Sequence, residues 1–115
     1  MNALDIAQVV HDTHQVYCWH IGDFTQVPWE EAPDWQRNST IAGVKAVIDS
    51  PDISPELLHE KWVQTRLADG WVYAPLKNVA RKEHPCLIEY HKLDINQKQK
   101  DYMFRAVVLA CMKVP

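Results

Sequence analysis

The segment from Ser54 to Gly70 constrains the fold most, because it carries signals for both ends of a helix. Ser54 can accept hydrogen bonds from the free N–H groups of a first turn, and Pro55 suits the first helical position, where no N–H is needed. Glu56 complements the positive end of the helix dipole, and Gly70 suits the left-handed conformation that closes a helix. We therefore expect a helix between Ser54 and Gly70.

Two further helices are predicted on the N-terminal side of this segment. Apolar residues recur at three- and four-residue steps from Leu4 to Tyr17, which predicts an amphipathic helix over residues 3–19. Pro33 suits the first turn of a second helix over residues 33–49. The inward residues of the second helix are expected to be Ile41, Val44 and Ile48.

A fourth helix is predicted after Asp94, whose carboxylate can cap it while Gln97 reaches back as in a capping box. The run from Ala106 to Met112 is apolar on nearly every side. We therefore expect either a central core helix or a contact surface for a second copy of the chain. The inner face is expected to consist of Ile95, Tyr102, Ala106 and Leu109.

Short strands are predicted after the capped helix. The run Trp71-Val72-Tyr73 suggests a strand near residues 71–74, with Trp71 and Tyr73 on the same side. Residues 86–89 are the candidate partner strand, because His84 precedes a proline and should be extended. The expected fold class is mainly α with a small β-hairpin (α+β), in which about four helices surround one core.

Composition limits the classes of protein to which the chain can belong. With 115 residues and 47% hydrophobic side chains, one domain with one core is expected. The net charge is −3 and charges of both signs are interspersed, which argues against nucleic acid or an anionic membrane as partner. The three cysteines form no CxxC pair and fit no disulfide framework. We expect a cytoplasmic protein with reduced thiols.

One set of residues has the order and spacing of a known repeat. It comprises His59, Trp62, the run Gly70-Trp71-Val72-Tyr73, Pro75, Lys82, the pair His84-Pro85, Leu87, Tyr90 and Leu93. In these residues the chain resembles the ryanodine-receptor repeat domain, or RyR domain, of the large calcium-release channels and of small single-domain proteins in bacteria and bacteriophages. The likeness extends to residues 28–44 and 100–111, and it departs from the family pattern at Ala74, where glycine is usual.

The resemblance implies one RyR-like domain over residues 1–115, with a core repeat at about 54–105 and two flanking helices. It implies a mainly helical fold with a small strand pair, and a module best known as non-catalytic. Microbial members look like sensors or binders of nucleotide-derived signals. Because the channel repeats pack in pairs, the resemblance also implies a homodimer.

An aromatic and basic corner is the candidate ligand site. A purine needs a flat surface on which to stack, and its phosphates need cationic donors nearby. We expect Trp71 and Tyr73 to stack and Lys77, Lys82 and His84 to contact phosphate or ribose. The full set is Trp62, Trp71, Tyr73, Lys77, Lys82, His84 and Tyr90. The alternative is that the aromatic residues fill the core while the lysines lie in solvent.

Other candidate chemistries are weaker. The side chains of His11, His14 and Cys18 share one helical face and could supply three zinc ligands, but no obvious fourth ligand follows. Catalytic motifs and Gly-rich phosphate loops are absent. We therefore expect no catalytic residues, metal or cofactor. The leading hypothesis is a non-enzymatic module that binds a nucleotide-like molecule, and the alternative is a protein-interaction domain that acts through a homodimer or partner interface.

Overall fold

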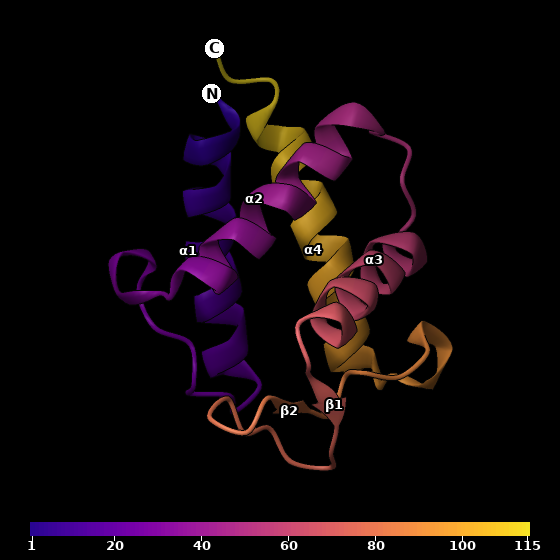
Figure 1. Cartoon of the computed structure of the whole chain (residues 1–115). Helices are drawn as coiled ribbons and strands as arrows, with labels where there is room; N and C mark the ends of the chain where they lie inside the picture. The colour runs from indigo at the N-terminus through magenta and orange to yellow at the C-terminus, as the bar shows by residue number, and fades with distance from the viewer.

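Four helices and two very short strands make up the computed structural model, which describes all 115 residues (Figure 1). The helices are α1 (Ala3–His20), α2 (Asp34–Asp49), α3 (Pro55–Ala68) and α4 (Ile95–Cys111). The strands are β1 (Val72–Tyr73) and β2 (Glu83–His84), and the short 3-10 helices are η1 (Trp29–Glu31) and η2 (Tyr90–Lys92). The mainly α class with a small β part is thus confirmed. None of the helices combines the length and the hydropathy that a membrane span needs.

The helix ends follow the predicted signals. The Ser54 hydroxyl accepts a hydrogen bond from the Leu57 N–H at 3.1 Å, and Gly70 takes a left-handed φ of +86°. Asp94 caps α4 by accepting from the Gln97 N–H at 3.0 Å. The Gln97 side chain does not reach back, however, because its Oε1 accepts a hydrogen bond from the Cys86 thiol instead.

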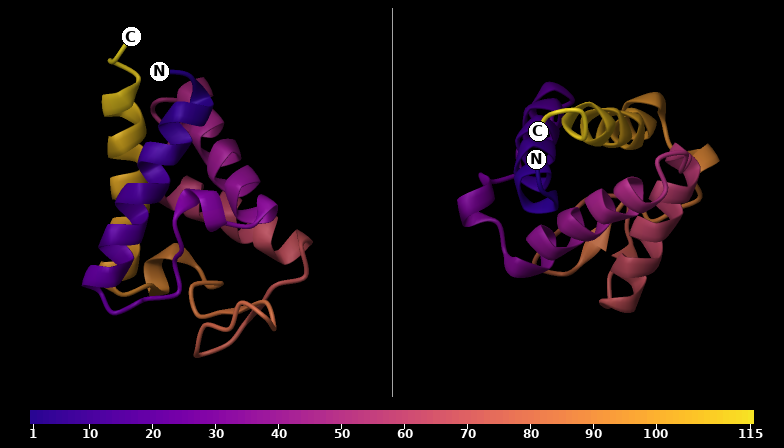
Figure 2. Two further views of the ribbon diagram at one scale, coloured as in Figure 1. Left: turned by 90° about the vertical axis from the view of Figure 1, so that its left-hand side faces the viewer. Right: turned by 90° about the horizontal axis from the view of Figure 1, so that it is seen from above.

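The helices form two layers, with α1 and α4 in one and α2 and α3 in the other (Figure 2). The two chain ends meet at one end of the bundle, where the Met1 ammonium donates to the Val114 carbonyl oxygen at 2.6 Å. The strands lie at the opposite end. One core joins all four helices, and its buried members include Ile6, Ala7, Val10, Val44, Val47, Leu58 and Val108.

The predicted β-hairpin is wrong in both the direction and the position of its second strand. β1 and β2 pair in parallel, with Val72 opposite Glu83 and Tyr73 opposite His84. The chain reverses once after β1 and again in a tight turn, where Asn78 and Glu83 exchange two backbone hydrogen bonds of 3.0 and 2.9 Å. Residues 86–89 form no strand. Pro85 lacks an N–H and ends the ladder at His84.

The inward faces of two helices also differ from the prediction. Along α4, Ile95 is 65% exposed and Tyr102 53% exposed, and Val108 is fully buried. Hydrophobicity misidentifies this face because polar residues occupy part of it, as the next section describes. On α1, Leu4 is exposed, and Ile6 occupies the buried position instead. On α2, Val44 is buried as predicted, together with Val47.

Candidate ligand-binding cavity

A cavity of about 940 Å³ lies at the strand end of the bundle, enclosed by all four helices and the loops that precede η1 and β2. Its size falls in the range of about 300 to 1,000 Å³ that is common for small-molecule sites. The exposed lining residues come mainly from α3, including Leu57, Lys61 and Gln64, and Ala42 is the exposed lining residue of α2. The cavity therefore opens to solvent between these two helices.

Arg66 is the most unusual group in the cavity wall. It lies on α3, one turn after Trp62, and is only 4% exposed. Its guanidinium carbon lies 4.9 Å from the ring centroid of Trp35 and 6.0 Å from that of Trp71. Two guanidinium nitrogens, Nε and Nη1, are buried without a hydrogen-bond partner, and so is the indole N–H of Trp71.

No carboxylate neutralises Arg66. Burial lowers its pKa, and the charge of nearby Asp69 partly opposes that effect. An arginine with an ordinary pKa above about 12 nevertheless remains charged in the folded protein. The Asp69 carboxylate is directed to Lys82, whose Nζ lies 3.7 Å from it. A buried guanidinium without an anion is costly, and its contacts with the Trp35 and Trp71 rings offset part of that cost.

A continuous row of aromatic rings leads away from Arg66. The ring centroids are 5.3 Å apart for Trp35 and Trp71, 6.3 Å for Trp71 and His84, and 5.0 Å for His84 and Trp62. The row continues through His59, whose centroid is 5.7 Å from that of Trp62. Neighbouring rings are tilted to one another by 30° to 75°. They therefore form a packed aromatic row and not one flat surface, and a planar ligand would stack on a single ring.

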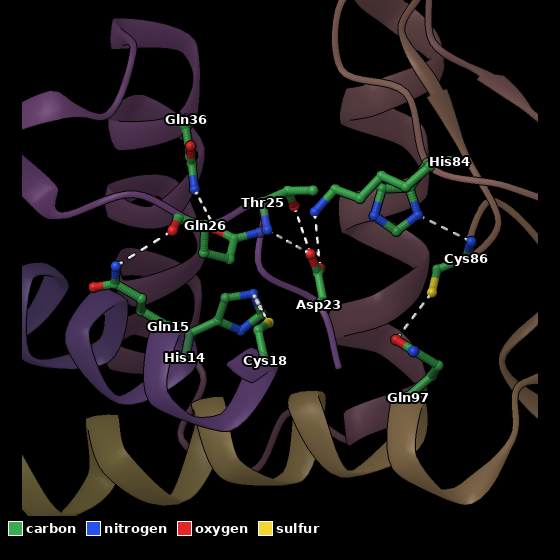
Figure 3. A network of polar contacts seen from close by, with 11 residues as sticks. His14, Gln15, Cys18, Asp23, Thr25, Gln26, Gln36, His84, Cys86 and Gln97 are labelled. Atoms are coloured by element: carbon green, nitrogen blue, oxygen red, sulfur yellow. Dashed lines mark hydrogen bonds and ion pairs between the residues drawn. The ribbon is translucent and has the colours of Figure 1, made fainter. Parts of the chain in front are cut away.

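His84 is a neutral donor within this row. Its Nδ1 accepts a hydrogen bond from the Cys86 N–H at 3.0 Å (Figure 3), so the ring proton of the neutral form is on Nε2. Burial, followed by the charges of Lys77 and Lys100, lowers the pKa of His84 to about 3. At neutral pH the ring is therefore uncharged, and it can donate one hydrogen bond from Nε2.

The opposite wall is polar and comes from α1 and the loop that follows it (Figure 3). Asp23 accepts hydrogen bonds from the hydroxyl and N–H of Thr25 at 2.6 and 2.9 Å, and from Lys77 Nζ at 3.1 Å. Burial raises the pKa of Asp23, but these hydrogen bonds and the Lys77 charge outweigh it and lower the pKa to about 2. The ion pair thus ties the loop after α1 to the loop between β1 and β2.

His14 belongs to the same polar wall. Its Nε2 lies 3.4 Å from Cys18 Sγ, and burial, followed by the Lys100 and Lys77 charges, lowers its pKa to about 3. Gln36 donates from Nε2 to Gln26 Oε1 at 2.8 Å beside it. This wall therefore offers uncharged polar groups to a ligand, in addition to the lysines.

The N-terminal half of α4 completes the cavity with Lys100 and Asp101. Lys100 is half-buried and makes no hydrogen bond or ion pair within the chain. Asp101 Oδ2 lies 3.7 Å from Nδ1 of His59, whose Nε2–H donates to the Ile88 carbonyl oxygen at 2.7 Å. Burial raises the pKa of Asp101 to about 7 and lowers that of His59. Near neutral pH, positive charge therefore predominates in the interior.

The comparison with protein families agrees with the resemblance seen in the sequence. The family described as RyR domain matches residues 49–114, which is more than half of the chain. The protein belongs to the RyR domain family. The RyR segment, as we call residues 49–114, contains α3, both strands and α4, and so it supplies Trp62, Arg66, Trp71, His84 and Lys100. The other lining residues, among them His14, Thr25 and Trp35, lie outside that segment.

Some of the seven site residues that were predicted from the sequence line the cavity, and the others lie outside it. Four of them, Trp62, Trp71, Lys77 and His84, line the cavity of the RyR domain. Tyr73 is 55% exposed, whereas Trp71 is 3% exposed, so the two rings do not share one side as expected. The reason is that β1 begins only after Trp71.

Lys82 and Tyr90 also lie outside the cavity lining. Lys82 adopts a φ of +53° in the turn before β2, and its Nζ donates to the Asp69 carbonyl oxygen at 2.8 Å. Tyr90, on η2, extends the aromatic row behind His59, with ring centroids 5.9 Å apart. Neither side chain is placed to contact a molecule in the cavity.

Sequence reasoning missed Trp35, Arg66 and Lys100. Arg66 follows Trp62 by four residues on the same helical face, which was a usable signal. Trp35 and Lys100 carried no comparable signal, because they are distant in sequence from the aromatic corner.

The possible zinc ligands on α1 serve other purposes. The ring of His11 is buried against Trp29, and its Nε2–H donates to the Val27 carbonyl oxygen at 2.6 Å. His14 faces the cavity beside Cys18. Nowhere in the structure do three His, Cys, Asp or Glu side chains gather closely enough to hold a metal ion.

Proposed function

We propose that this RyR domain protein is a non-enzymatic module that binds a nucleotide or a nucleotide-derived small molecule in the cavity. The observation that carries the proposal is the buried Arg66 guanidinium, which lies against Trp35 and Trp71 and has no anionic partner. A phosphate would satisfy the free N–H groups of the guanidinium, and a base would stack on the aromatic row.

The charge of the wall favours an anion over a cation. Rows of aromatic rings also form cages for quaternary ammonium groups. Here, however, Arg66 and Lys100 both lack an ion-pair partner within the chain, and Asp101 has a pKa raised by burial to about 7. The other two carboxylates of the lining, Glu31 and Glu60, are exposed to solvent. A cationic ligand would add to an excess of positive charge, whereas a phosphate would reduce it.

Two observations support a binding role over a catalytic one. Burial raises the pKa of the Cys86 thiol, which donates a hydrogen bond to Gln97 Oε1 at 3.2 Å. Burial likewise raises the pKa of Cys18. Thiols in this state are poor nucleophiles. All three cysteines are free, which supports a cytoplasmic location as part of the proposal.

The alternative function, a protein-interaction domain, draws less support. It depends on an exposed apolar face on the last helix, but Val108 is fully buried there and Val107 packs partly against the core. The other expected contribution, exposed tryptophans, comes only from Trp19, which is 47% exposed on α1. We therefore place the ligand-binding role first.

Thermal unfolding against a nucleotide panel tests the proposal. The panel contains mono-, di- and cyclic nucleotides, ADP-ribose and NAD, each measured with the wild type, Arg66→Leu and Arg81→Leu. At about a hundred times its dissociation constant, a ligand adds about 2.7 kcal/mol to the free energy of unfolding and raises Tm by several degrees. We expect Arg66→Leu to abolish this shift without lowering the Tm of the ligand-free protein, because it removes an unpaired buried charge.

Arg81→Leu is the matched control. The side chain of Arg81 is 74% exposed, so this variant should keep the full ligand-induced shift. A panel without any shift, or a shift that survives Arg66→Leu, would contradict the proposal.

A further inference from the structure

Two unpaired cations that are at least partly buried lie in different parts of the cavity wall, and a third, Lys61, is exposed to solvent. Arg66 is on α3 beside Trp35 and Trp71, and we call this group the Arg66 pole. Lys100 is on α4, and we call it, with the polar His14, the Lys100 pole. Both poles line the same continuous space.

The two poles lie between different elements. Lys100 and His14 also line a small second pocket between α1 and α4, and Arg66 lies outside that pocket. Arg66 lies instead beside Trp35 on α2 and Trp71 before β1. The Arg66 charge and the Lys100 charge therefore occupy two separate positions in the cavity wall.

The Lys100 ammonium has no ion-pair contact within the protein, although its charge lowers the pKa of the neighbouring Asp101 against the larger effect of burial. Lys77 is neutralised by Asp23 through the ion pair of 3.1 Å, which leaves Lys100 without a partner. The acid that follows it, Asp101, is directed toward His59 at 3.7 Å. The Lys100 ammonium is therefore available to a ligand that extends from the Arg66 pole.

Building on the proposed function, we propose that the ligand carries two separate anionic groups, one bound at Arg66 and one at Lys100, with its uncharged middle on the aromatic row. The chemical class is a nucleotide that is phosphorylated at two positions, or a short linear dinucleotide. The Nε2–H of His84 lies between the poles and would donate to the ribose or the base. A nucleotide with a single cluster of phosphates would engage one pole only.

Isothermal titration calorimetry with matched ligands tests this inference. ADP carries its two phosphates in one cluster, adenosine 3′,5′-bisphosphate carries two separate ones, and the 5′-phosphorylated dinucleotide pApA extends the span. Each is titrated into the wild type, Arg66→Gln, Lys100→Gln and the double variant. Lys92→Gln, at an exposed position on η2, is the control for the loss of one positive charge.

For at least one two-ended ligand, we expect each single substitution to weaken binding about tenfold or more, and the double variant to lose the product of the two factors. The binding of ADP should be weakened by only one of the two single substitutions. The Lys92→Gln variant should bind every ligand as the wild type does.

Two results would overturn the inference in distinguishable ways. If nucleotides bind but no two-ended ligand depends on both Arg66 and Lys100, the two-pole arrangement fails and the proposed function stands. If none of the three ligands binds and the wider panel causes no thermal shift, both fail. The Tm of each variant is measured in parallel. A value equal to that of the wild type shows that the variant has lost affinity and not its fold.

Discussion

The same helices are built differently at their two ends. At the end where the chain termini meet, α1 contributes Ile6 and Ala7, and α4 contributes Val108, all at most 1% exposed. At the strand end, the same two helices contribute His14 and Lys100, among other polar groups, to the cavity. One half of the bundle is a close-packed core, and the other half encloses space.

The side chains at the apolar end and at the cavity end contribute differently to the stability of the fold. Burial of aliphatic side chains at the apolar end favours folding. At the cavity end, the fold buries the Arg66 guanidinium without hydrogen-bond partners for Nε and Nη1, and it raises the pKa of Asp101. Both effects cost free energy of folding. Such local conflicts are expected where a site is arranged for a ligand.

The largest effect is expected from truncation at the apolar end. Ile6→Ala should lower the free energy of unfolding by about 2 to 5 kcal/mol, because it leaves a cavity among residues that are almost fully buried. Ile95→Ala is the matched control, since Ile95 is 65% exposed, and it should change stability by about 0.5 kcal/mol or less. Chemical denaturation measures both, and similar losses for the two variants would contradict the division into two ends.

An intermediate effect is expected from Asp101→Asn at the cavity end, and it should depend on pH. The folded-state pKa of about 7 lies above the ordinary value of 3.8. Protonated Asp101 therefore contributes stability that is fully present below about pH 4 and is lost as pH rises through about 7. The variant should gain about 2 to 3 kcal/mol more over the wild type at pH 8 than at pH 5.

His14 and His84 act with the opposite sign. Their folded-state pKa values of about 3 lie below the ordinary 6.5, so their contribution is present above pH 6.5 and is lost as pH falls. This loss is shared by the wild type and Asp101→Asn and cancels in the difference. Asp12→Asn, at an exposed position on α1, is the control. A difference that does not vary with pH would show that Asp101 is already ionised in the folded protein.

The smallest effect is expected from Lys82→Ala. The side chain lies outside the cavity, and its ion pair with Asp69 is largely exposed, so it should contribute about 0 to 1 kcal/mol. Nucleotide affinity, measured by calorimetry, should equal that of the wild type, whereas Lys100→Gln should weaken it. If Lys82→Ala weakens binding as much as Lys100→Gln does, the ligand lies at the turn before β2 and not in the cavity.

The sequence by itself determined the helices and their ends. Ser54, Gly70 and Asp94 act locally, through caps and a left-handed turn, and such signals can be read without knowledge of the fold. The RyR resemblance likewise rests on local order and spacing. By contrast, the parallel strand pair depends on a double reversal of the chain, which no short segment specifies.

Only the tertiary structure decided which side chains share the cavity. Trp35 and Arg66 are 31 positions apart in the numbering, and Lys100 is 34 positions beyond Arg66, yet all three line one space. Hydrophobic periodicity placed Ile95 and Tyr102 on the inner face of α4, because it assumes that every inward position is apolar. A helix that faces a cavity breaks that assumption, since a polar group such as Lys100 can line the cavity without entering the core.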